Sequence, residues 1–517
     1  MLFMVLKANK KRQEILVPLR LVELIPENDF CFLVENVLEQ IDFEKYNSKF
    51  FKTPGQKAYD REILLGIVLK GAIDGGLSGR EVGRRVQTDL SYMYLTGMEK
   101  PNFRTINRFK KEYPELIDEA LETVVKIAEK EDLVRLQQIS IDGSKIKAKA
   151  SVNKIVTEDV IKILKKQFQE SLEKDNEEND LFGENGDIIP SNKVTDKESF
   201  EKIMEEIKEE TKDSKNHEKL NAQSLKILKK GLEDKEYAQK FIDKSQLYLD
   251  EFEKTEQKSL SWNDPEAHRM PGKDGRMRFN YNPQIAVDSH SGIIISARLS
   301  NNPTDHYELI PLIEDIESKY GQLKPGTQIF ADNGYSTDEN TQYLKDKDLD
   351  GYIASRKLSR KAKKYNKNDN PFSKDYFTFD LEKDGYICPQ GQILNHKGIY
   401  KNGLKTVYWT NNCKYCPERI NCCGKYRNRT ITDYGNPSKI EMQRKMETEE
   451  AQELYKIRGK TVEWPFGNIK RNMKVIEFNT TGLERTDTEF KLLSIAHDLK
   501  IIQNARLKQI TNENQNT

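Results

Sequence analysis

The stretch that most constrains this chain is TQIFADNGYS, at residues 327–336. A short apolar run, residues 329–331, has β-strand character, Asp332 follows it, and an Asn-Gly pair then ends it with residues typical of turns. A carboxylate at the end of a buried strand is held by a rigid element and still reaches solvent, which is where α/β folds place functional groups. The same letters also fit an Asx turn in which Asp332 only caps the strand end.

A second acidic residue occupies a similar place earlier in the chain. Asp142 follows the β-type run 139–141 and precedes a Gly-Ser pair. Lys145, Lys147 and Lys149 alternate after it, so they would share one face of a strand. Such a row fits contacts with DNA phosphates, and it fits equally an edge strand protected by lysines.

The pattern around these two acids predicts a mixed α/β sheet. Residues 280–299 form two alternating runs around a turn, which is the signal of a β-hairpin. When the charged block 151–260 is left out, residues 135–356 predict the order strand, hairpin, helix, strand, helix, strand. His306 lies near this predicted core, so we expect it to approach the site.

The total charge of +1 hides an asymmetry along the 517 residues. Residues 151–260 hold 20 lysines, no arginine and 27 acidic residues, a net charge of −7, which leaves +8 for the rest of the chain. The near-neutral total therefore does not argue against an anionic partner. No membrane span or signal peptide is predicted, because the apolar opening MLFMVL is too short for either, so we expect a cytoplasmic protein.

The first part of the chain predicts short helices with a basic end. Residues 58–125 carry helical spacing interrupted by glycines, and Ser78 is the expected N-cap of one helix. The segment PNFRTINRFKKEY then brings Arg104 and Arg108 onto a basic helix. This arrangement is typical of a DNA-binding helix-turn-helix, and it fits equally a helical bundle with a solvated basic face.

Five of the six cysteines lie between residues 388 and 423. Without a secretory signal, such a group indicates metal or redox chemistry rather than a disulfide framework. A C-x2-C pair with two further cysteines is able to form a tetrahedral zinc site, and buried reduced thiols are the alternative. The candidate ligands are Cys388, Cys413, Cys416 and a fourth that is either Cys422 or Cys423.

A third acidic residue, Glu463, lies in YKIRGKTVEWPFGNIKRNMK, residues 455–474, surrounded by lysines and arginines. On one continuous helix Glu463, Phe466 and Lys470 share a face, whereas a helix that starts near Pro465 would put Glu463 at its N-terminus. A surface helix with routine ion pairs is the simpler interpretation. If Asp142, Asp332 and Glu463 converge, the three carboxylates suit two Mg²⁺ ions that serve phosphodiester chemistry.

These stretches, in this order, resemble the DDE transposases of bacterial insertion sequences. ISIDGSKIKA is similar to the segment with the first catalytic Asp of that family, and IFADNGYS to the segment with the second. The stretch that starts at Tyr455 is similar to the family signature of Tyr, Arg, Glu and Lys. The resemblance thus implies Asp142, Asp332 and Glu463 as catalytic acids that bind two Mg²⁺ ions, for which Mn²⁺ can substitute. It implies DNA contacts by a second set of side chains: Tyr455, Arg458, Lys470, Arg104, Arg108 and Lys145.

The resemblance also implies an architecture. A helical DNA-binding domain (1–130) would precede an RNase H-like α/β core, with a charged helical insertion, a small β-rich insertion that bears the cysteines and zinc, and a polar tail. The core would consist of 131–150, 260–356 and 440–505, the insertions of 151–259 and 357–439, and the tail of 506–517.

The function that the resemblance implies is transposition. The chain would bind the terminal inverted repeats of its element as a homodimer on double-stranded DNA, cut the ends and transfer the strands, with no membrane partner. Two alternatives stay open: an RNase H-fold nuclease without strand transfer, and a non-catalytic DNA-binding protein derived from a transposon.

Overall fold

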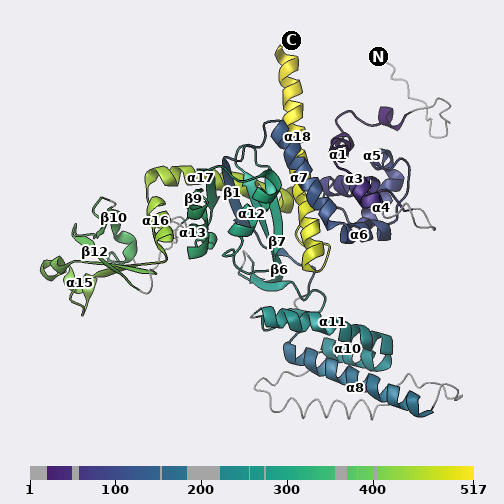
Figure 1. Cartoon of the computed structure of the whole chain (residues 1–517), viewed down its shortest axis with the longest axis horizontal. Helices are drawn as coiled ribbons and strands as arrows, with labels where there is room; N and C mark the ends of the chain where they lie inside the picture. Colours follow the sequence, from purple (N-terminus) through teal and green to yellow (C-terminus); the bar gives the residue numbers. More distant parts are fainter. Residues whose placement is uncertain are drawn as a thin grey trace, which may run out of the picture. The chain divides into compact units, whose positions relative to one another are not determined.

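The computed structural model describes residues 20–48, 58–151, 154–182, 222–255, 257–272, 275–354, 370–380, 382–400 and 404–516. The chain divides into two compact units, one within residues 1–131 and 495–517 and the other within 132–494 (Figure 1). Of the helices in this described part, none has the length and apolar character needed to cross a bilayer.

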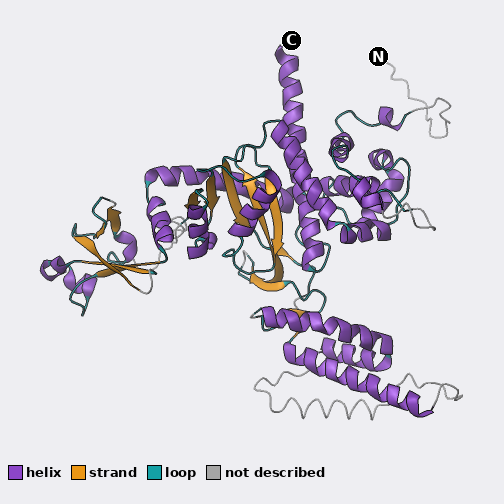
Figure 2. Cartoon of the chain, viewed as in Figure 1, coloured by secondary structure: helices purple, strands orange, loops and turns teal. Residues whose placement is uncertain are grey.

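The first unit is helical throughout its described residues (Figure 2). Its elements are η1 (Leu21–Leu24), α1 (Phe30–Leu38), α2 (Glu44–Asn47), α3 (Arg61–Ile73), α4 (Gly79–Thr88), α5 (Leu90–Leu95), α6 (Phe103–Glu112), α7 (Pro114–Lys130) and the later part of α18 (Leu483–Asn516). The predicted N-cap is confirmed, because the Ser78 hydroxyl accepts a hydrogen bond from the Glu81 amide and so starts α4. Helix α3 is buried on nearly all sides and forms the centre of this unit.

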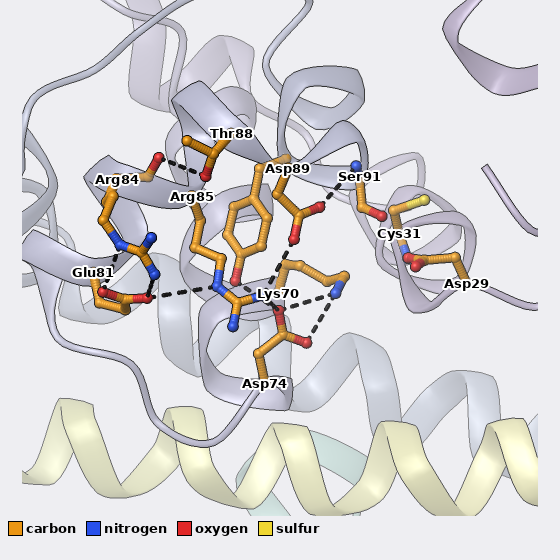
Figure 3. A network of polar contacts seen from close by, with 11 residues as sticks. Asp29, Cys31, Lys70, Asp74, Glu81, Arg84, Arg85, Thr88, Asp89 and Ser91 are labelled. Atoms are coloured by element: carbon orange, nitrogen blue, oxygen red, sulfur yellow. Dashed lines mark hydrogen bonds and ion pairs between the residues drawn. The ribbon is translucent and has the colours of Figure 1, made fainter. Parts of the chain in front are cut away.

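Charged side chains around α3 and α4 bind one another within the first unit (Figure 3). Asp74, at the end of α3, accepts hydrogen bonds from Lys70 Nζ at 2.8 Å and from the Tyr92 hydroxyl at 2.9 Å. Arg85 of α4 lies 3.7 Å from Asp74 Oδ2 and 3.2 Å from Asp89 Oδ2. Arg85 of α4 is therefore engaged in the packing of this unit.

The second unit is built on a mixed sheet. Across its centre the strands run β7–β6–β1–β8–β9, in which β6 pairs antiparallel with β7 and β1, and β8 pairs parallel with β1 and β9. The hairpin predicted at 280–299 is confirmed by the β6–β7 pair. The strands are β1 (Gln138–Gly143), β2 (Ile146–Lys147), β5 (His268–Pro271), β6 (Met277–Asp288), β7 (Ile294–Ser300), β8 (Gln328–Ala331) and β9 (Asp350–Ile353). The mixed α/β class is thus confirmed, and the RNase H-like assignment remains a prediction.

Helices pack on this sheet and connect its strands. Helix α12 packs on β6 and β7, α13 packs on β9, and α17 packs on β1, β6 and β8. The elements are α12 (Leu309–Tyr320), η3 (Asn333–Tyr335), α13 (Asp338–Asp346), α16 (Pro437–Lys445), α17 (Glu449–Gly467) and the π-helical turn η6 (Asn468–Asn472).

The charged block forms helices, as its spacing predicts, and has a core of its own. The elements are β3 (Ile155–Val156), α8 (Glu158–Phe182), α10 (Ala222–Glu233), α11 (Lys235–Lys254) and β4 (Leu260–Ser261). Phe168, Tyr248 and Trp262 are central to its apolar cluster. The block is therefore more than a solvated surface, and its status as an insertion in a catalytic core remains a prediction.

The cysteine-bearing segment is a small antiparallel sheet whose five strands pair in chain order. Its core is aromatic, with Phe377, Tyr386 and Tyr408 buried together. The elements are η4 (Lys374–Tyr376), β10 (Thr378–Asp380), β11 (Gly385–Ile387), β12 (Ile393–Tyr400), β13 (Lys405–Trp409), η5 (Asn411–Tyr415), α15 (Arg419–Cys423) and β14 (Thr430–Tyr434).

Candidate active site

Two parallel strands bring Asp142 and Asp332 to the same edge of the sheet. Ser140 of β1 pairs with Phe330 of β8, so each aspartate lies two residues further along its own strand direction. Neighbouring strands are about 4.8 Å apart, so the two carboxylates are close to each other. Asp332 Oδ1 also accepts a hydrogen bond of 2.6 Å from the Gly334 amide, which starts η3. The strand-end and the turn interpretations of Asp332 therefore both hold.

Helix α17 supplies a cation to this pair of acids. Arg458 Nη2 donates a hydrogen bond of 2.7 Å to Asp142 Oδ1, and both side chains are mostly buried. Burial raises the pKa of Asp142 to about 6 although the Arg458 charge opposes this, and the nearby charges of Asp332 and Asp305 act in the same direction as burial. Tyr455, one turn before Arg458, packs against the cluster that holds Phe330.

Two lysines after Asp142 and in η6 are held inside this site. Lys470 Nζ donates to Ser144 Oγ at 2.6 Å and to the Lys145 carbonyl at 2.9 Å, so η6 is fixed to the loop that follows Asp142. Lys145 Nζ lies 3.9 Å from Asp305 Oδ1, and burial lowers the pKa of this lysine. The lysine row after Asp142 is thus engaged with the protein, and Lys147 likewise forms an ion pair, with Glu477.

Glu463, the third predicted acid, lies on α17. Helix α17 continues through Pro465, so Glu463 lies near the end of one continuous helix, and the alternative of a helix N-terminus is wrong. Its side chain is exposed, and the charges that act most on Asp142 belong to other residues. Across the described parts of the chain, no three or more His, Cys, Asp or Glu side chains are placed to hold a metal ion. The convergence of three acids therefore remains a prediction.

In the first unit, α6 presents the basic face that the sequence predicts. Ile106 and Phe109 are buried, whereas Arg104 and Arg108 are exposed. No acidic side chain in the described residues pairs with either arginine, in contrast to Arg85 of α4. The exposed positive charge of this unit is thus available on α6, the last helix of the predicted helix-turn-helix.

Comparison with protein families finds two matches. Residues 387–502 match the family described as "Transposase DDE domain", and residues 19–112 match the one described as "Transposase domain (DUF772)". The chain is a DDE transposase of the insertion-sequence type. No curated protein and no solved structure gives a significant match.

The two matches cover different candidate residues of this transposase. The DDE match includes Tyr455, Arg458, Glu463 and Lys470, and the N-terminal match includes the basic helix α6. Asp142 and Asp332 lie between the matched segments. Their assignment therefore rests on the strand geometry and on the contact with Arg458.

The DDE match also includes the cysteines of the transposase. Within one small cavity of about 20 Å³, all five cysteines between residues 388 and 423 contribute to the lining. Burial, followed by the neighbouring Cys413 and Cys422, raises the pKa of Cys423 to about 12. The candidate zinc ligands therefore lie around one cavity. Cys423, the alternative to Cys422 as the fourth ligand, lines the same cavity.

One acidic residue of this site was missed by the sequence reasoning. Asp305 lies beside Asp142 and Asp332, whereas its neighbour His306, which we expected near the site, is exposed. Asp305 sits in a turn between β7 and α12 with no strand-end pattern. The available signal was its place just after a predicted hairpin and just before a predicted helix.

Proposed function

We propose that this transposase binds the terminal inverted repeats of its own element, cuts the DNA at the element ends and joins those ends to a target. The observation that carries the proposal is the placement of Asp142 next to Asp332 on parallel strands, with Arg458 of the DDE-matched helix α17 bound to Asp142. Phosphodiester chemistry needs acidic ligands that sit next to cationic groups, and this edge of the sheet supplies both.

The donor set at this edge suits Mg²⁺, with Mn²⁺ as a substitute. Mg²⁺ in phosphoryl-transfer sites takes one or two carboxylates, together with waters and substrate phosphates, rather than a complete protein cage. Asp142 and Asp332 supply those carboxylates, and Glu463 is proposed as the third acid on the strength of its family motif. Two bound ions would activate a water or a 3′-hydroxyl and stabilise the leaving oxygen.

The basic residues take roles that follow from their contacts. Arg458 neutralises Asp142 in the metal-free protein, and Tyr455 packs beside this arginine. Lys470 fixes the loop after Asp142, and together these three side chains would border the scissile phosphate. Arg104 and Arg108 would contact phosphates of the element end from α6, while Lys145, which faces Asp305, would act at the site itself.

The test is cleavage and joining of DNA that carries the element ends, with Mg²⁺. We expect Asp142→Asn, Asp332→Asn and Glu463→Gln each to reduce cleavage at least a hundredfold. The control is Asp346→Asn, which changes an exposed aspartate of α13 and should cut normally. Normal cleavage by Asp332→Asn would contradict the proposal.

The same reaction separates transposition from its two alternatives. Joined products identify a transposase, cutting without joining or end preference identifies a nuclease, and binding without cutting identifies a DNA-binding protein. Light scattering of the complex with end DNA tests the proposed homodimer.

We also propose that the cysteines of the small sheet bind one structural zinc ion. What supports this is that the candidate cysteines line one cavity. Four deprotonated thiols would suit a closed tetrahedral zinc site, and such a site stabilises a small domain directly. Elemental analysis of the purified protein should find about one zinc per chain. Cys413→Ser should lose it and Cys31→Ser, which changes the remote cysteine of the first unit, should keep it. Protein purified with no zinc would favour reduced thiols.

A further inference from the structure

A basic groove of about 600 Å³ lies beside β2 and the start of β6. Its lining comes from the chain after Asp142, from the β5–β6 hairpin and from the segment between η6 and α18. Of the described residues that line it, four are basic and one is acidic, a local charge of +3: Lys147, Lys149, Arg276, Arg278 and Glu477. Such a concentration of one charge attracts an anionic partner.

The lysine row after Asp142 connects the active site to this groove. The residues between these lysines are buried, so the lysines themselves share one side of the extended chain. Lys145, the first of the row, has its Nζ 3.9 Å from Asp305 Oδ1 in the site, whereas Lys147 and Lys149 line the groove. One continuous row of positive charge therefore leads from the site into the groove.

The register on β6 gives the distance between the two places. Asp142 pairs with Ile285 of β6 and Lys147 pairs with Asn280, five residues nearer the start of that strand. At about 3.3 Å per residue, the groove begins about 17 Å from Asp142, and Lys149 lies two residues further on. Successive phosphates of one DNA strand are about 3.4 Å apart along the helix axis, so this distance corresponds to about five to seven nucleotides.

The two lysines are held in place by the segment that follows η6. The Phe478 amide donates a hydrogen bond of 3.0 Å to the Lys147 carbonyl, and the Phe478 side chain is buried. Lys149 Nζ donates to the Asn479 carbonyl at 2.9 Å. Lys147 pairs with Glu477, but these side chains are 41% and 38% exposed, and an ion pair in water contributes so little that a phosphate can replace it.

We propose that this basic groove binds the DNA backbone about five to seven nucleotides from the scissile phosphate. The inference rests on the proposed function, because Asp142 has to mark the position of the cut. DNA is the partner that fits, since its phosphates match the positive lining and the groove continues the lysine row from the site. Contacts with phosphates fix the position of a duplex without reading its bases, so the groove holds any sequence in line with the cut.

The first test measures how binding of end DNA to the full-length protein depends on salt. Lys149 and Arg276 are exposed, so the double variant Lys149→Ala/Arg276→Ala should fold, which its urea unfolding midpoint checks. We expect it to reduce the slope of log K against log salt by about 2, because each lost phosphate contact contributes about 1. Lys149→Arg/Arg276→Lys keeps both charges and should keep the slope.

The charge-matched control is Lys229→Ala/Lys240→Ala, which removes two exposed lysines of the charged helices α10 and α11. This control should leave the slope unchanged. An unchanged slope for Lys149→Ala/Arg276→Ala, or an equal reduction by the control, would overturn the inference.

A second measurement locates the contact on the DNA. Methylphosphonates, each of which removes the charge of one phosphate, are placed singly along both strands of the end DNA. With the unchanged protein, neutral linkages about five to seven nucleotides from the cut should weaken binding. With Lys149→Ala/Arg276→Ala the same linkages should have no further effect, because the partner charges are already gone. Full sensitivity of the variant at these linkages, or sensitivity of the unchanged protein only at other positions, would overturn the inference.

The outcomes also separate this inference from the proposed function. Normal cutting of the end DNA together with an unchanged salt slope in the double variant would overturn the inference and leave the proposed function standing. No binding of end DNA by the unchanged protein would overturn both. Loss of polyglutamate binding by the variant, with DNA binding and its slope unchanged, would assign the groove to an acidic protein segment instead.

Discussion

Arg458→Met removes the cation that faces Asp142 while it keeps an unbranched apolar side chain in α17. The hydrogen bond from Arg458 Nη2 to Asp142 Oδ1 is 2.7 Å, and the two side chains are 15% and 22% exposed. Methionine cannot donate to the carboxylate, so the charged form of Asp142 would lie in a mostly buried place without a partner, and the pKa of Asp142 would rise further. The variant therefore tests whether this pair stabilises the metal-free site.

The size of the effect follows from the burial of the pair. Loss of one partner of a fully buried ion pair costs about 3–5 kcal/mol, and the partial exposure here reduces this to about 2–3 kcal/mol. The pKa of Asp142 is raised to about 6, so this carboxyl is ionised in the folded protein only above that pH. The ion pair therefore stabilises the fold at pH 8, and its contribution disappears as the pH falls below about 6. We expect the full cost of Arg458→Met at pH 8 and a clearly smaller cost at pH 5.

Urea unfolding followed by tryptophan fluorescence measures this cost. The three tryptophans, Trp262, Trp409 and Trp464, all lie in the second unit, so the signal reports the unit that contains the site. Chelator is added to remove divalent metal. The control is Arg135→Met, which removes the exposed ion pair with Asp132 and should change the unfolding midpoint much less. An equal effect of Arg458→Met at the two pH values, or one no larger than that of the control, would refute this account of the pair.

Three further changes have defined outcomes. Asp264 is buried and its pKa is raised to about 6, so its charge destabilises the fold as the pH rises through 6. Asp264→Asn should therefore raise the free energy of unfolding by up to about 3 kcal/mol at pH 8 and leave it unchanged near pH 4. Equal unfolding midpoints at pH 8 would contradict this. Gly143→Ala should lower the free energy of unfolding by about 1–3 kcal/mol, because the added Cβ would contact Gln284 and Asp305. Gly459→Ala, in open space on α17, should raise the free energy of unfolding by about 0.5–1 kcal/mol. Denaturation of the two variants checks that the two changes have opposite signs. Arg104→Ala and Arg108→Ala should each weaken binding to end DNA and reduce the slope of log K against log salt by about 1, and an unchanged slope in fluorescence anisotropy would exclude these arginines from the interface.

The sequence was sufficient for the parts of the site that depend on local pattern. Alternation and turn residues predicted the strand before Asp142, the strand before Asp332 and the hairpin between them. For residues 455–474 the spacing of Glu463, Phe466 and Lys470 left two interpretations open, a continuous helix and a helix that begins near Pro465, and the structure supports the first up to Gly467. The pairing of the two aspartates depends on which strands become neighbours and in what register, and the structure supplies that.

Other parts of the site depend on contacts that local pattern does not encode. Asp305 lies in a turn, and only the packing of that turn on β6 brings it to Asp142. The lysine row fits phosphate contacts or a protected edge strand, and the sequence does not indicate that Lys145, which lies between β1 and β2, has its Nζ 3.9 Å from Asp305 Oδ1. Glu463 has a strong motif and yet an exposed position, because α17 turns its Arg458 face toward the sheet.

The most direct test of the central claim is the position of the metal in crystals of the protein bound to its end DNA and Mn²⁺. Anomalous scattering locates the ions independently of any assumption about the fold. We expect Mn²⁺ between the carboxylates of Asp142 and Asp332, with Glu463 brought to the same ions. Mn²⁺ that is bound elsewhere, with Asp142 still paired to Arg458 and no metal at Asp332, would contradict the assignment of this edge of the sheet as the catalytic centre.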